Sequence, residues 1–161
     1  MRVYVATTLA GLQELIDTGV VPADGRMHGV TPALRESFAE ADAEELEYAA
    51  LTAAARDSLH ALAANADAPR RRVVIAAEVP ERAATPTNES PSRVTVSASL
   101  GRSDVAAVHV DDVAATETIA AAVGALADAE SGDDEASAVV EDAAGWELMW
   151  FATQEIEDLL T

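Results

Sequence analysis

The sequence alternates between short β-branched segments and longer alanine-rich segments, and this alternation limits its fold more than any other feature. Residues 2–6, RVYVA, have the β-branched and aromatic composition of a strand. Apolar residues then recur at helical spacing from Leu9 to Ile16, and Gly19 follows where a helix would end. The chain therefore opens with a strand followed by a helix.

The same patterns predict the rest of the elements. A long helical region at 32–65 contains a break near 41–43, and a loop precedes it at 20–32. The other predicted elements are strands at 71–79, 92–100, 104–112 and 146–152, a helix at 113–129 and a final helix at 153–160.

Strands and helices interleave without strict alternation, which is typical of an α+β fold. We expect a two-layer sandwich in which a mixed five-stranded sheet carries helices on one face. If the helical pair at 32–65 is an insertion, the remainder resembles a ferredoxin-like sandwich with an extra strand. The 161 residues suit a single domain spanning 1–161, with mobile loops at about 81–92 and 129–145.

Composition limits which cellular compartment and which classes of partner are expected. The chain has no cysteine, which excludes thiol chemistry and fits a reducing compartment, and no apolar run long enough to cross a membrane. Its net charge is −19, and a field of that sign repels nucleic-acid backbones and anionic membranes. The sequence thus predicts a cytoplasmic protein that binds neither nucleic acid nor membrane.

Aromatic residues are scarce, at 4% of the chain, yet Trp146, Trp150 and Phe151 fall within six positions. As a strand, this segment would be apolar on both faces. We expect it to fill an alanine-rich core, with Trp146 the more exposed ring, rather than to form an aromatic binding surface.

The segment HVDD contains the clearest candidates for catalytic or cation-binding residues. His109, Asp111 and Asp112 lie where a strand ends and a helix begins, a position at which α/β folds often place ligands. They can act as an acid–base pair or hold a cation. They can equally be a packed histidine followed by a helix cap.

Other candidates are scattered. His28 lies in a loop near Arg26, and the basic run that contains Arg71 and Arg72 can grip an anion or pair with carboxylates. Tyr4 is a further candidate for ligand binding. The acidic cluster at 42–47 fits a helix N-terminus better than a metal site.

Strong enzymatic motifs are missing. There is no P-loop, no glycine-rich dinucleotide fingerprint, no G-x-S-x-G motif, and no serine placed with a partner histidine and acid. The sequence predicts no cofactor and no metal.

Segments 30–62, 70–80, 106–112 and 146–160 together resemble a small actinobacterial family described only as a domain of unknown function. The resemblance covers nearly the whole chain and is weakest at 81–105 and 128–145. It implies a single-domain cytoplasmic protein, and it supplies no catalytic residue.

Two functions remain open from sequence. The first is a non-catalytic binding or regulatory module, with another protein as its partner. The second is a small hydrolase or transferase that acts on an anionic small molecule at the strand ends near His109. A cleft that joins His109 and Asp111 with Tyr4 or His28 would favour the enzyme.

Overall fold

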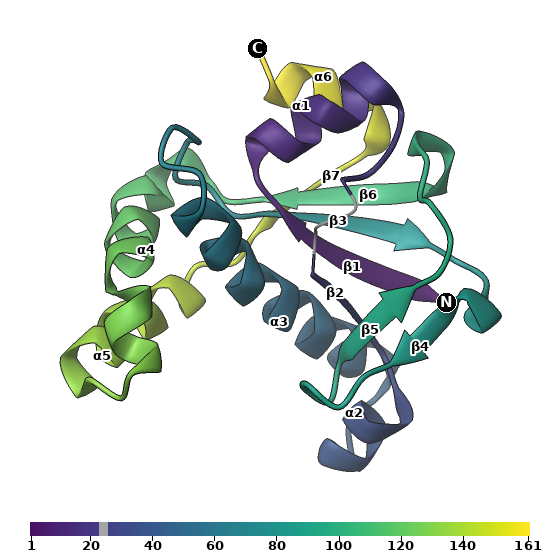
Figure 1. Ribbon diagram of the computed structural model, residues 1–161, viewed down its shortest axis with the longest axis horizontal. Coiled ribbons are helices and arrows are strands. Elements are labelled where there is room, and N and C mark those ends of the chain that lie inside the picture. The colour runs from purple at the N-terminus through teal and green to yellow at the C-terminus, as the bar shows by residue number, and fades with distance from the viewer. Residues whose placement is uncertain (23–25) are drawn as a thin grey trace.

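A computed structural model describes residues 1–22 and 26–161, and it is built around one open sheet (Figure 1). Within these ranges the sheet has seven strands in the order β4-β5-β2-β1-β3-β6-β7, and every neighbouring pair is antiparallel. The strands are β1 (Arg2–Thr7), β2 (Met27–Gly29), β3 (Val73–Glu78), β4 (Ala84–Pro86), β5 (Arg93–Val96), β6 (Val105–Val110) and β7 (Met149–Phe151).

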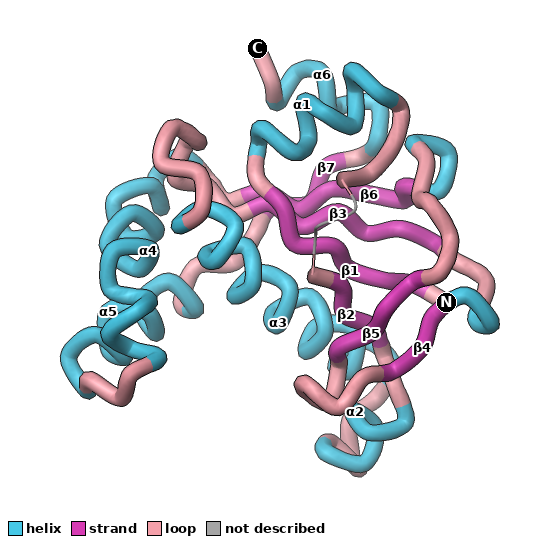
Figure 2. Tube along the Cα trace, viewed as in Figure 1, coloured by secondary structure: helices cyan, strands magenta, loops and turns pink. Residues whose placement is uncertain are grey.

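Helices cover both faces of this sheet (Figures 1 and 2). One face carries α1 (Leu9–Thr18) and α6 (Ile156–Leu159), and the other carries α2 (Pro32–Ser37) and α3 (Ala43–Ala63). The remaining pair, α4 (Thr116–Glu130) and α5 (Asp134–Ala144), packs against the C-terminal half of α3. None of the helices within the described ranges combines the length and the apolar character needed to cross a membrane.

The α+β class is confirmed, but the predicted architecture is wrong. The sheet is antiparallel rather than mixed, it has seven strands rather than five within the described residues, and helices lie on both faces, so the ferredoxin-like sandwich is not formed. The two missed strands, β2 and β4, have three residues each. Strands this short carry too little alternation to be recognised, and they lie in the segments predicted as loops.

Local sequence explains where the helices begin and end. Thr8 accepts a hydrogen bond from the Gly11 amide at the start of α1, and Gly19 ends the helix at a φ of 75°, where a side chain would be strained. At the start of α3, Asp42 accepts from the Glu45 amide at 2.9 Å. The acidic cluster therefore lies at the positive end of the helix dipole, as the sequence indicates.

The two faces of the sheet have different cores. Under α1 and α6, leucine and isoleucine side chains such as Leu12, Leu15 and Ile156 pack on valines of β1, β3 and β6. Under α3 the helix contributes alanines, of which Ala50 and Ala54 are fully buried. Small side chains allow a helix axis to lie close to the sheet, so α3 packs tightly with little apolar volume.

The tryptophans do not fill the core. Trp150 is 61% exposed and Trp146 is 37% exposed, so the expected burial of this segment is wrong. The reason is its place in the sheet, because β7 is an edge strand of three residues and pairs with β6 alone. Trp146 precedes the strand and belongs to a connecting segment.

Three predicted loops contain regular structure. Helix α5 occupies most of the acidic segment at 129–145, where we expected a loop, and β4 lies within 81–92. Asp133 caps α5 by accepting from the Glu135 amide, so the acidic residues here begin a helix. The predicted loop at 20–32 contains β2, and its positions 23–25 lie outside the described residues.

The apolar face of α1 should contribute much of the stability. We expect Leu12→Ala to lower the free energy of unfolding by about 2–5 kcal/mol, because the fully buried side chain leaves a cavity between α1 and the sheet. Urea denaturation followed by circular dichroism measures this change. The neighbouring exposed variant Gln13→Ala should change it by less than about 0.5 kcal/mol, and equal effects of the two variants would contradict the packing described.

Candidate functional site

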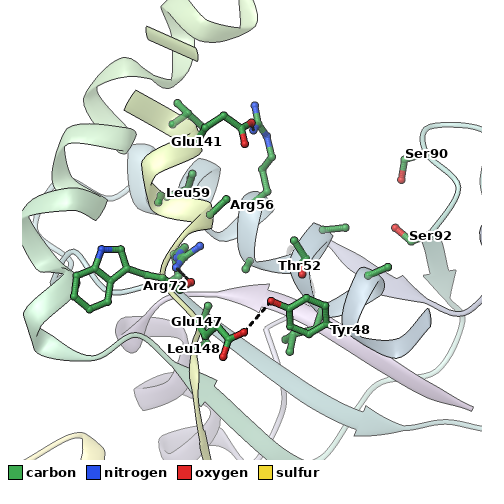
Figure 3. Close-up of a pocket in the computed structure, with 18 of the residues that line it drawn as sticks. Tyr48, Thr52, Arg56, Leu59, Arg72, Ser90, Ser92, Glu141, Glu147 and Leu148 are labelled. Carbon is green, nitrogen blue, oxygen red and sulfur yellow. Dashed lines mark hydrogen bonds and ion pairs between the residues drawn. The ribbon is translucent and has the colours of Figure 1, made fainter. Parts of the chain in front are cut away.

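A groove of about 620 Å³ runs across the exposed side of α3. Tyr48, Thr52 and Arg56 of α3 form its floor. Figure 3 shows Ser90 and Ser92 on one side of these residues, and Arg72, Glu147 and Leu148 on the other. The groove is thus bounded by the segment before β5 on one wall and the segment before β7 on the other.

The groove is lined mainly by apolar side chains, with a few polar groups among them. Its apolar side chains include Leu34, Phe38, Leu59, Val140 and Trp146.

Two residues of the floor, Tyr48 and Arg56, are each paired with a glutamate. The Tyr48 hydroxyl donates to Glu147 at 3.3 Å, and the Arg56 guanidinium lies 3.8 Å from Glu141. These contacts are exposed and weak, so the paired groups can turn towards a ligand at small cost.

Ser90 is the exception on the opposite wall. Its Oγ is buried but has no hydrogen-bond partner among the residues that the structure describes. A buried hydroxyl that stays unpaired costs about 1–3 kcal/mol, so this group has a strong tendency to bind a ligand atom or water.

A chain of buried polar side chains begins at the same wall. Ser92 Oγ lies 2.7 Å from His28 Nδ1, and His28 Nε2 lies 2.5 Å from Asp57 Oδ2. His28 and Ser92 are each 4% exposed. Arg26 closes the chain at its far end, where Nη1 lies 3.1 Å from Asp57 Oδ1.

These connected side chains set the ionisation of Asp57. Burial raises the pKa of the carboxyl group, but the hydrogen bonds that it accepts from His28 and Arg26, together with the charge of Arg26, outweigh burial and hold the pKa below its usual value. Asp57 is therefore a carboxylate at neutral pH, and it can only accept hydrogen bonds.

The next residue of α3 makes a second buried connection. Ser58 Oγ donates to the Thr7 carbonyl at 2.6 Å and accepts from the Val73 amide at 3.1 Å. Ser58 thereby joins the end of β1 to the start of β3, while Asp57 reaches β2 through His28. The position of α3, and so the floor of the groove, depends on these two adjacent residues.

The predicted strand-end carboxylate Asp111 has a structural partner. It is fully buried, and its two oxygens accept from Arg72 Nε and Nη2 at 2.8 Å each, while the Arg72 amide donates to the same carboxylate. Arg71 Nε donates to the Asp111 carbonyl at 2.9 Å. Arg72 thus makes the carboxylate pairing that the sequence left open, whereas Arg71 binds the backbone carbonyl of Asp111. Arg72 also donates to the Trp146 carbonyl at one end of the groove.

His109 and Tyr4 lie together on the α3 face of the sheet, where Tyr4 is the cross-strand partner of His28. Their ring centroids are 6.5 Å apart with the planes tilted by 58°. Burial and the nearby Arg2 charge lower the pKa of His109, so the ring is neutral at pH 7. Burial, helped by the Glu47 carboxylate, raises the pKa of Tyr4 to about 12.

The structure therefore does not assemble the site predicted from HVDD. The Asp111 carboxylate is paired with Arg72. Asp112 caps the turn at Val113–Ala115 by accepting from the Ala114 amide at 3.0 Å. Among the described residues, no group of three or more histidine, aspartate or glutamate side chains is arranged to hold a metal ion. Of the predicted candidates, Arg72 lines the groove, and His28 contacts the lining residue Ser92.

Sequence reasoning missed the partners of His28. Ser92 is 64 positions from His28, and Asp57 is 29 positions away, so no local motif marks them. The one available signal was a polar pair, Asp57 and Ser58, on a helix whose surroundings are largely alanine.

Comparison with known proteins gives one match. A family model with the description "Family of unknown function (DUF6912)" matches residues 1–160. The resemblance to a domain of unknown function is confirmed over the chain, while the actinobacterial origin stays a prediction. No curated protein matches the chain, and no solved structure does.

The pair formed by Arg72 and Asp111 is expected to be essential for folding. Asp111→Ala should lower the free energy of unfolding by about 3–5 kcal/mol, because it leaves the Arg72 guanidinium buried without its partner. The neighbouring variant Asp112→Ala removes an exposed cap and should cost about 1 kcal/mol. Chemical denaturation compares the two variants, and an Asp111→Ala effect no larger than that of Asp112→Ala would refute this assignment.

Asp57 should make stability depend on pH in the acidic range. Its folded-state pKa lies below the unfolded value, so its contribution is present above the unfolded pKa and is lost as pH falls through the folded pKa. Denaturation curves from pH 7 down to pH 3 should therefore show a stability difference between wild type and Asp57→Asn that shrinks as pH falls. A difference that stays constant over this range would contradict the ionisation described.

Proposed function

The chain belongs to the DUF6912 family, whose function is unknown, and we propose that it is a binding module for a small, flat, mainly apolar molecule that carries a hydrogen-bond acceptor. The ligand lies in the groove across α3, with its ring system over Tyr48 and Thr52 and its acceptor at Ser90.

The observation that carries this proposal is the groove itself. Its volume of about 620 Å³ falls within the range of roughly 300–1,000 Å³ that small-molecule sites occupy. Its surface combines a largely apolar lining with a few polar groups that can fix the orientation of a ligand, which is the usual composition of such sites.

The placement of aromatic residues gives further support. The chain has two tryptophans, two tyrosines and two phenylalanines, and three of these six residues line the groove. Phe38, Tyr48 and Trp146 are all counted among the exposed large apolar side chains rather than the core. In a protein with so few aromatic rings, three exposed rings around one hollow favour stacking against a flat ligand.

Ser90 is the hydrogen-bond partner for the polar group of the ligand. The buried and unpaired hydroxyl can donate one hydrogen bond, and a carbonyl oxygen is the acceptor that fits an apolar site at least desolvation cost. The charge of the ligand also matters, because the protein has a net charge of −19 and repels anions. A neutral ketone, amide or ester is therefore favoured over a carboxylate.

The two functions considered from sequence have less support. An enzyme at the strand ends near His109 would need Asp111, whose carboxylate is bound by Arg72. A protein partner remains a prediction, and a stable protein interface usually covers about 800 Å² on each side, a larger surface than a hollow of this size offers.

Binding can be tested with 2-acetylnaphthalene, a neutral aromatic ketone. In a Trp150→Phe background Trp146 is the one remaining tryptophan, and its fluorescence should change on titration because its ring lies at the groove. Thr52→Phe places a ring on the groove floor and should weaken binding about tenfold or more, a loss of about 1.4 kcal/mol or more.

The matched control is Ala120→Phe, an equal change on the exposed side of α4. It should leave binding unchanged. A titration without saturation, or equal weakening by Thr52→Phe and Ala120→Phe, would refute the groove as the binding site.

A further inference from the structure

Three side chains, of which Ser92 lines the groove and the other two lie behind it, are connected in the order that activates a serine. Ser92 lines the groove, its hydroxyl contacts His28 at 2.7 Å, and His28 contacts Asp57 at 2.5 Å on the opposite ring nitrogen. These contacts connect the turn before β5 with β2 and α3.

The chemistry of the partners fixes the position of each proton. The Asp57 carboxylate only accepts, so His28 Nε2 carries the hydrogen that it receives. In a neutral imidazole the other nitrogen is then an acceptor, and the Ser92 hydroxyl donates to Nδ1. This is the arrangement in which a histidine serves as general base for a serine nucleophile.

The ring nitrogens are exchanged relative to serine proteases, in which Nε2 faces the serine. The roles depend on geometry rather than on which nitrogen is used, because either nitrogen of neutral imidazole can accept a proton. Both His28 and Ser92 are almost fully buried, so a ligand that covers the wall would exclude water from them.

We propose that Ser92 is a nucleophile that accepts the acyl group of an uncharged aromatic ester bound in the groove. This inference rests on the proposed function, because the ester must occupy the groove to reach Ser92. Ser90, two residues away on the same wall, supplies the hydroxyl that hydrogen-bonds the ester carbonyl oxygen as negative charge develops on it.

The reaction balances with the ester and water alone. Ser92 Oγ attacks the carbonyl carbon while its proton passes to His28 Nδ1. The bond from the carbonyl carbon to the alcohol oxygen then breaks, and Nδ1 returns the proton to the departing aromatic alcohol. Water later attacks the acyl-serine by the same proton route, which releases the carboxylic acid and restores Ser92. Asp57 is a positioning residue, since it acts through His28.

The experiment uses 2-naphthyl acetate with the full chain. Wild type should release 2-naphthol, and peptide mass spectrometry should find one acetyl group on Ser92 after rapid acid quenching. Ser92→Ala should lose both signals, whereas Ser99→Ala, at an exposed serine after β5, should keep them. Asp57→Asn should slow release by about 10²–10⁴-fold and change the pH profile of the rate.

The outcomes separate this inference from the binding proposal. Binding of 2-acetylnaphthalene without acetylation of wild-type Ser92 would overturn the nucleophile and leave the binding module standing. Loss of both binding and acetylation would overturn both proposals. Labelling of wild-type Ser92 by a fluorophosphonate provides a second readout that does not depend on whether a variant folds, and its absence would also count against the nucleophile.

Discussion

Two adjacent polar residues of α3 determine where this helix lies, and the rest of the molecule depends on that position. Asp57 binds His28 of β2, and Ser58 binds the backbone of Thr7 and Val73 at the ends of β1 and β3. The helix buries mostly alanine against the sheet, which gives it less apolar contact than leucine would. Directional hydrogen bonds therefore fix the register of α3 where apolar packing alone would be less specific.

The small size of the core side chains also explains the groove. The core is made of valine, leucine, isoleucine and alanine, and the larger rings of Phe38, Tyr48 and Trp146 are left at the surface around α3. The walls are fixed at both ends by buried polar groups. Arg72 holds the Trp146 carbonyl on one side, and the contact of Ser92 with His28 anchors the other. Buried hydrogen bonds thus hold both walls of the groove in place.

Sequence patterns were sufficient for elements with long periodic segments and insufficient for contacts between distant residues. The first strand, α1 with its Gly19 end and α3 were predictable because capping and periodicity act locally. Strands β2 and β4 were not, since three residues carry no readable period. His28 was identified as a candidate, but its partners are 29 and 64 positions away, and such pairings are set by the order of strands in the sheet.

The central claim is that the groove across α3 is a small-molecule site with Ser90 as its polar anchor. A crystal structure of the protein soaked with 2-acetylnaphthalene tests it most directly. We predict density for the ring system over Tyr48 and Thr52, with the ketone oxygen about 3 Å from Ser90 Oγ. A fully occupied ligand elsewhere on the molecule, or an empty groove at saturating ligand concentration, would contradict the account.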